Sequence, residues 1–210
     1  MNLDQTIRQF IDRFTMPDLK SLDWKVTAER LRQQFYIASR SIEKDAPEMA
    51  DVSLIAVPGG AGSLKARLYT PLGAGIAPGP GIVFYHGGGF VLGDLESHDM
   101  LCRRLAEGAR SRVVSIDYRL APEHKFPAAH DDALTVWKWI VENAGKLGLD
   151  PERLAVSGDS AGGNLSAYLA QEMNRTGGPA PAFQLLLYPL VQFADIRTKK
   201  MPFNESGFFI

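Results

Sequence analysis

From residue 81 onward, short apolar runs alternate with longer segments whose apolar residues recur at helical spacing. The apolar runs cover residues 81–85, 112–116, 154–157 and 183–188, and the helical patterns cover 99–110, 128–144 and 161–175. Continuous apolar runs are typical of strands buried on both faces, and helices between such strands produce right-handed βαβ units. The sequence therefore predicts an α/β fold with a mainly parallel, doubly wound sheet.

The segment before this alternation follows two other patterns. Residues 1–48 carry apolar side chains at helical spacing, which predicts two helices separated by Pro17. Residues 52–56 and 64–68 show the alternation of half-buried strands on either side of a glycine-rich turn, which predicts a hairpin-like pair. We therefore expect two domains, a helical segment at 1–48 and an α/β core at 49–210.

Composition argues against several classes of function. The chain holds 23 basic and 24 acidic residues, and its net charge of −1 gives no field that would attract nucleic acid. No apolar run reaches the roughly 20 residues that a membrane span needs, and the N-terminus lacks a secretory pattern, so we expect a cytoplasmic protein. Cys102 is the only cysteine, which argues against an internal disulfide and a cysteine-based metal site, and its helical surroundings predict a packed thiol.

The motif Gly158-Asp159-Ser160-Ala161-Gly162 lies directly between a predicted strand and a predicted helix. A bare G-x-S-x-G occurs by chance in roughly one chain in fifteen of this length, so its position matters more than its letters. A sharp strand-to-helix turn holds such a serine in a strained conformation, and Gly158 and Gly162 would avoid collisions with neighbouring strands. Ser160 would then stand at the carboxyl end of the sheet and at a helix N-terminus, which favours negative charge. We predict that Ser160 is a nucleophile.

A second motif, His86-Gly87-Gly88-Gly89, follows the first buried strand. Three successive glycines are conformationally costly, so we expect the loop to place backbone N–H groups near a ligand. The N–H groups of Gly88 and Gly89, with that of Ala161, are predicted to form an oxyanion hole, where one donor typically lowers the barrier of acyl transfer by about 3 kcal/mol. His86 is predicted to fix the shape of the loop by hydrogen bonding rather than to act as the base.

Four motifs in this order resemble those of the hormone-sensitive-lipase family of esterases, bacterial family IV. They are His86-Gly87-Gly88-Gly89-Phe90, Asp117-Tyr118-Arg119-Leu120-Ala121-Pro122-Glu123-His124, Phe126-Pro127-Ala128-Ala129 and Gly158-Asp159-Ser160-Ala161-Gly162-Gly163-Asn164-Leu165. The resemblance runs from about residue 50 to 190, and Asp159 matches the GDSAG subgroup. It implies an α/β-hydrolase fold whose N-terminal helices form a cap over the active site. It also implies hydrolysis of small carboxylic esters with short to medium acyl chains, without a cofactor or a metal.

The charged residues of the loop at 117–129 could be read as a catalytic cluster. We predict instead that Arg119, Asp117 and Glu123 form a structural ion-pair network that locks the loop after a strand.

The chain departs from the resembled family after Ser160. An α/β-hydrolase orders its catalytic triad as serine, acid, histidine. All four histidines of this chain precede the serine: His86, His98, His124 and His130. We therefore expect these residues to be part of a longer protein, to lack the last strands of the fold, and to be nearly inactive alone, since a serine without its base keeps only ~10³–10⁴-fold catalysis. The strand at 183–188 would then be an apolar edge, which predicts a complementing C-terminal chain or a homo-oligomer.

The missing histidine leaves other functions open. A non-catalytic small-molecule receptor, similar to the plant gibberellin receptors that share this fold, would need no base. Amide or thioester hydrolysis by the same serine is a further alternative to ester hydrolysis.

Overall fold

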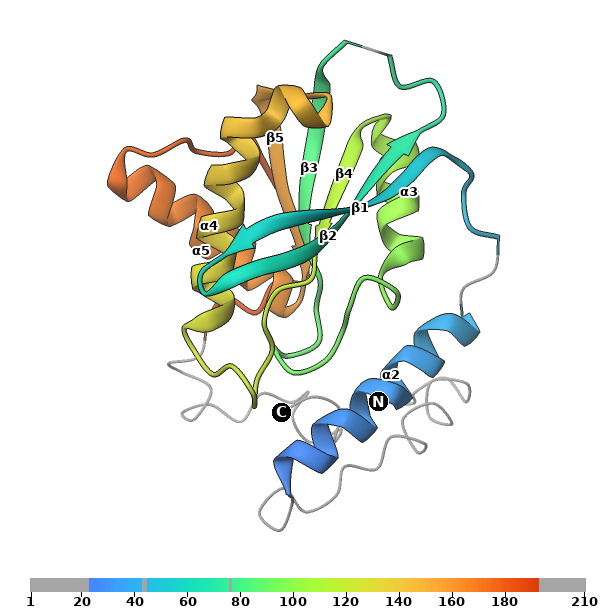
Figure 1. The fold of residues 1–210 in the computed structure, drawn as a ribbon, viewed down its shortest axis with the longest axis vertical. Coiled ribbons are helices and arrows are strands. Elements are labelled where there is room, and N and C mark those ends of the chain that lie inside the picture. Colours follow the sequence, from blue (N-terminus) through green and yellow to red (C-terminus); the bar gives the residue numbers. More distant parts are fainter. Residues whose placement is uncertain (1–22, 43–44, 76, 193–210) are drawn as a thin grey trace, which may run out of the picture.

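The computed structural model describes residues 23–42, 45–75 and 77–192 (Figure 1). The helix predicted before Pro17 lies outside this part of the chain. The described elements are, in order, α2 (Trp24–Ile42), β1 (Met49–Gly59), β2 (Gly62–Pro71), β3 (Gly79–Tyr85), α3 (Asp99–Ala109), β4 (Arg112–Ile116), α4 (Ala128–Asn143), a 3-10 helix (Ala144–Leu147), β5 (Leu149–Asp159), α5 (Ala161–Thr176) and β6 (Phe183–Leu187). None of these helices is long and apolar enough to cross a membrane.

The described strands form one sheet in the order β1-β2-β4-β3-β5-β6. The four strands β4, β3, β5 and β6 run parallel, and the antiparallel hairpin of β1 and β2 extends the sheet beside β4. Strand β3 lies between β4 and β5, because the chain adds β4 on one side of β3 and β5 on the other. The predicted α/β fold with a mainly parallel sheet is confirmed, and so is the hairpin.

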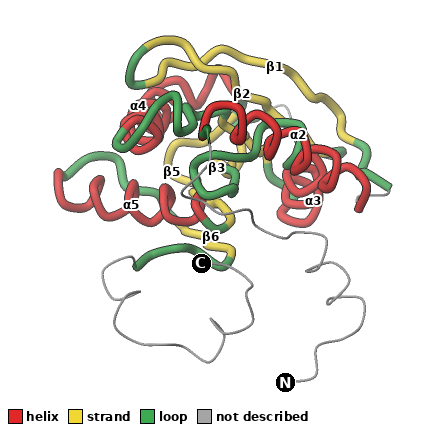
Figure 2. The backbone as a smooth tube through the Cα atoms, turned by 90° about the horizontal axis from the view of Figure 1, so that it is seen from below, coloured by secondary structure: helices red, strands yellow, loops and turns green. Residues whose placement is uncertain are grey.

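Helices cover both faces of the sheet, which explains why its strands are continuous apolar runs (Figure 2). In β3, Val83 and Tyr85 pack into one buried cluster with side chains of α4 and α5. Ile82 and Phe84 point to the opposite face and pack with Cys102 and other residues of α3. Successive side chains of a strand alternate between faces, so a strand covered on both sides needs apolar residues at every position. The prediction of a packed Cys102 thiol is confirmed, since this side chain is fully buried.

The predicted ion-pair network of Arg119 with Asp117 and Glu123 is wrong. Arg119 instead donates its Nε and Nη2 to the buried carboxylate of Asp132 in α4, at 2.9 and 2.8 Å. Glu123 accepts from Arg32 of α2, with an Nη2–Oε2 distance of 2.7 Å. The fold brings these partners in from helices that the local sequence of the loop does not contain.

Arg32 also attaches helix α2 to the core. Arg32 donates from Nε to the carbonyl oxygen of Val91 at 2.7 Å and from Nη2 to that of Ala121 at 2.9 Å. One side chain therefore joins α2 to the loop after β3 and to the loop after β4. The division into a helical cap at 1–48 and a core at 49–210 stays a prediction.

Candidate active site

The two glycine-containing motifs meet at the carboxyl ends of neighbouring parallel strands. Tyr85, the last residue of β3, lies opposite Gly158 in β5. The chain continues from these positions into the triple-glycine loop and into the turn at Ser160. A 2.7 Å hydrogen bond from the N–H of Gly87 to Oδ1 of Asp159 joins the two segments directly.

Ser160 has the backbone conformation expected of a tight strand-to-helix turn. Its φ is 48° and its ψ is −112°, between the end of β5 and the start of α5. A positive φ at a residue other than glycine costs of order 1–3 kcal/mol and persists where the surroundings fix it. Here the N–H of Ser160 donates to the carbonyl oxygen of Leu187 at 2.9 Å, and its own carbonyl accepts from the N–H of Asn164 at 3.0 Å. The residue as a whole is half-buried.

The glycines of the turn are required by the close approach of β3. A Cβ on Gly162 would stand 1.8 Å from the carbonyl oxygen of Tyr85, and a Cβ on Gly158 would stand 2.3 Å from the carbonyl carbon of Gly162. Real Cβ atoms do not approach other atoms so closely, and the neighbour here is backbone that cannot rotate away. The steric reason predicted for these glycines is therefore present in the structure.

The triple-glycine loop leaves two of its amides without an internal acceptor. Gly88 and Gly89 have φ values of 120° and 62°, a region that other residues rarely adopt. The N–H of Gly87 donates to the carboxylate of Asp159, but the N–H groups of Gly88 and Gly89 have no backbone acceptor among residues 77–192. Gly88 is half-buried and Gly89 exposed. The assignment of these amides and that of Ala161 to an oxyanion hole stays a proposal.

His86 is fully buried beneath the loop. Its Nδ1 donates to the carbonyl oxygen of Gly87 at 2.9 Å, and its ring stacks on that of Tyr118 with centroids 4.3 Å apart. The Tyr118 hydroxyl donates to the carbonyl oxygen of His86 at 2.6 Å. Burial, with a smaller effect of the nearby His98, lowers the pKa of His86 to about 4. These contacts suit a residue that fixes the shape of the loop.

No sequence motif predicted that two further side chains, those of His98 and Tyr188, belong to this site. His98, at the start of α3, places its Nε2 3.4 Å from Oδ1 of Asp159. Tyr188, directly after β6, places its hydroxyl 3.4 Å from Oδ2 of the same carboxylate. Neither lies within a motif, and only the tertiary fold brings them to Asp159.

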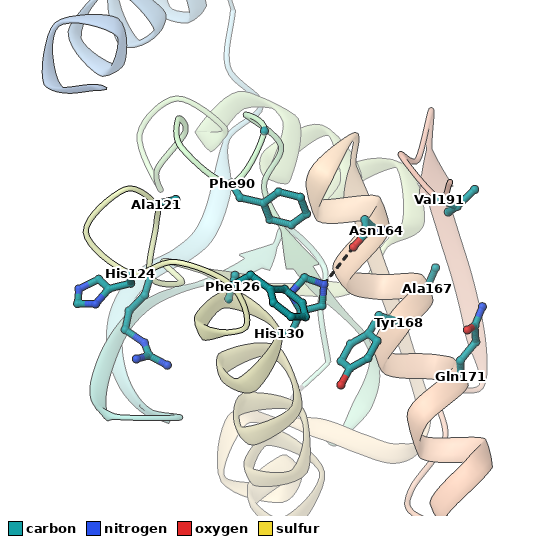
Figure 3. A pocket seen from close by; sticks show the side chains of 13 residues that line it. Phe90, Ala121, His124, Phe126, His130, Asn164, Ala167, Tyr168, Gln171 and Val191 are labelled. Carbon is teal, nitrogen blue, oxygen red and sulfur yellow. Dashed lines mark hydrogen bonds between the residues drawn. The ribbon is translucent and has the colours of Figure 1, made fainter. Parts of the chain in front are cut away.

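An open pocket of about 550 Å³ adjoins the triple-glycine loop (Figure 3). It runs from Gly89 along the groove between α4 and α5. At its centre, His130 contacts three aromatic rings and lies 3.2 Å from the side-chain oxygen of Asn164 through its Nε2. The rings are those of Phe90, Phe126 and Tyr168. Ser160 is not among the lining residues, but Asn164 connects the pocket to it, because the N–H of Asn164 bonds the Ser160 carbonyl.

Comparisons with known proteins agree on one family. A family model described as an alpha/beta hydrolase fold matches residues 82–210. A protein named carboxylic ester hydrolase LipN from Mycobacterium tuberculosis is 48% identical over 165 residues, which are 76% of this chain and 43% of the relative. An ethyl acetate hydrolase from Pseudomonas putida is 40% identical over 188 residues, which are 87% of this chain and 58% of the relative. The chain thus spans about half the length of these relatives.

A solved structure shows the same arrangement of elements. An ester hydrolase from the metagenome of Lake Arreo, complexed with a derivative of bipyridine phosphonate, is 43% identical with a TM-score of 0.78. The match covers 88% of this chain and 57% of that one.

Proposed function

Because this chain belongs to the α/β-hydrolase fold family, and within it to the hormone-sensitive-lipase group of esterases, we propose that it carries the serine nucleophile and the oxyanion hole of a carboxylic ester hydrolase. The observation that supports this most directly is the strained turn at Ser160, tied beside the triple-glycine loop by the Gly87–Asp159 hydrogen bond. An ester carbonyl placed between them would meet a hydroxyl on one side and backbone N–H groups on the other.

In the proposed reaction, Oγ of Ser160 attacks the ester carbonyl carbon and its proton passes to a histidine base. The electron pair of the carbonyl moves onto oxygen, where the N–H groups of Gly88, Gly89 and Ala161 stabilise the charge. As this intermediate collapses, the histidine gives the proton to the departing oxygen and the alcohol leaves. Water, deprotonated by the same histidine, then attacks the acyl-enzyme, which releases the carboxylic acid and restores the Ser160 hydroxyl. The chain order of the family places the base after the serine, so no histidine of this chain is assigned to it.

The pocket beside Gly89 is proposed to hold either the acyl or the alcohol part of the ester. Its volume of about 550 Å³ and its mixture of rings and small apolar side chains suit a small substrate. We therefore expect esters with short to medium acyl chains to be hydrolysed faster than long-chain esters.

The test is hydrolysis of p-nitrophenyl acetate and butyrate by the protein at its full encoded length. Ser160→Ala is expected to lower kcat by at least about 10⁴-fold, because the nucleophile is removed. Ser166→Ala is the matched control: it removes a buried hydroxyl of the same helix that has no hydrogen-bond partner among the described residues, so activity should stay at the parent level.

A phosphonate ester provides a second readout, since a phosphonate derivative is bound in the Lake Arreo relative. Mass spectrometry should find the adduct on the peptide that contains Ser160. Turnover that survives in Ser160→Ala would remove this serine from the mechanism. Tight binding of small acids without any turnover by the parent would favour a receptor instead.

A further inference from the structure

The carboxylate of Asp159 stands next to the nucleophile, yet the proposed reaction gives it no task. The residue is 7% exposed, and its Oδ1 accepts the 2.7 Å hydrogen bond from Gly87. His98 lies 3.4 Å from Oδ1, and the hydroxyl of Tyr188 lies 3.4 Å from Oδ2. One carboxylate therefore joins the turn at Ser160 to the glycine loop, to the start of α3 and to the segment after β6.

A negative charge at this position needs a structural reason. It opposes the negative charge that develops on the substrate oxygen, and it is costly to bury unless it is paired and hydrogen-bonded. Burial alone raises the pKa of Asp159, but the nearby His98 ring and the hydrogen bond from the N–H of Gly87 outweigh burial and hold the pKa below its usual value. The side chain is therefore an ionised hydrogen-bond acceptor at neutral pH.

The glycine loop is packed directly onto this carboxylate. A Cβ on Gly87 would stand 2.1 Å from Oδ2 of Asp159, so only a glycine lets the loop come so near. The peptide that carries the N–H of Gly88 begins at the same residue. Because peptide units are planar, only the φ and ψ of Gly87 lie between the tethered amide and the first proposed oxyanion donor.

We propose that Asp159 is a positioning residue for the oxyanion hole. Its carboxylate holds the N–H of Gly87 and thereby orients the N–H groups of Gly88 and Gly89 toward the carbonyl that Ser160 attacks. Gly87 itself is thus a tether and not an oxyanion donor. This inference rests on the proposed function and adds to it a specific task for the acid of the motif.

The kinetic test compares two substitutions in the protein at its full encoded length. Asp159→Ala removes the acceptor, and kcat is expected to fall by about 10–100-fold, which is less than the loss of an entire donor. KM should change by less than about threefold, because the oxyanion contact forms mainly in the transition state. Asp159→Asn keeps an oxygen that accepts from Gly87 and should restore kcat to within about fivefold of the parent. Should Asp159→Ala not fold, Asp159→Val fills more of the volume, offers no acceptor and is read in the same way.

A second measurement does not depend on catalysis. In protein labelled with ¹⁵N-glycine, hydrogen exchange of the Gly87 amide should accelerate by at least about tenfold in Asp159→Ala. Asp99→Asn is the matched control. Asp99 is also a buried acid with several hydrogen bonds, but its partners are Tyr69, Arg67 and Arg103 and not the glycine loop. This variant should leave both kcat and the Gly87 exchange rate unchanged.

The outcomes separate this inference from the proposed function. An unchanged kcat in Asp159→Ala, or an Asp159→Asn variant as impaired as Asp159→Ala, would overturn the positioning role even if Ser160→Ala is inactive. Turnover retained in Ser160→Ala would instead overturn the proposed function, and the exchange rate of Gly87 would still decide whether Asp159 holds the loop.

Discussion

Replacing Arg119 with methionine should lower the free energy of unfolding by about 3–5 kcal/mol, because a fully buried carboxylate would lose its counter-charge. The Asp132 side chain has 0% of its surface exposed, and that of Arg119 has 19%. Asp132 would keep only the backbone N–H groups of Gly60 and Arg119, at 2.7 and 3.0 Å. Methionine retains much of the aliphatic volume of arginine, so lost packing should contribute little to the change.

Urea unfolding at pH 7, followed by circular dichroism, measures this loss. In thermal unfolding of a domain of this size, a loss of 4 kcal/mol corresponds to a fall of about 8–16 °C in Tm. Arg175→Met is the matched control, since Arg175 also makes a two-point contact, with Glu172, at 2.9 and 2.6 Å. Its side chain is 71% exposed, and the expected loss is below about 1 kcal/mol. Equal losses in the two variants would refute the reasoning, because the predicted difference rests on the burial of the Arg119–Asp132 pair.

Three further outcomes are expected. Gly162→Ala should cost about 3 kcal/mol or more, because its Cβ would overlap the Tyr85 carbonyl; parent-like urea stability would contradict this. The pKa of His86 is lowered to about 4 in the folded protein, so between pH 6.5 and 4 the unfolded chain binds more protons than the folded one. The free energy of unfolding should therefore fall by about 3 kcal/mol as the pH drops from 6.5 to 4. In His86→Gln, this part of the pH dependence of stability should be absent. Burial raises the pKa of the Cys102 thiol to about 12, so Ellman's reagent should modify it only after unfolding; rapid reaction of the folded protein would contradict this.

The sequence by itself determined the fold class and the edge of the sheet at which the two motifs lie. Continuous apolar runs such as 81–85 require cover on both faces, and helical patterns between them leave only a parallel sheet with helices on each side. Parallel strands end at the same edge, so the segments after β3 and β5 had to lie at one edge of the sheet. That β3 and β5 are neighbours there was decided by the strand order of the folded sheet. The tight turn at Ser160 was also readable, because only glycine tolerates the contact that Gly162 makes with Tyr85.

Only the tertiary structure decided which charged groups meet. Arg119 forms its ion pair with Asp132 and not with Asp117, which is nearer in the sequence. Glu123 pairs with Arg32, which lies 91 residues away along the chain. The position of His98 beside Asp159 was equally invisible in the sequence. The burial of apolar residues can be predicted from their periodicity, which is visible in a short stretch of sequence. A hydrogen bond or ion pair depends on distances of a few ångströms between side chains, and those distances are set by how whole helices pack on the sheet.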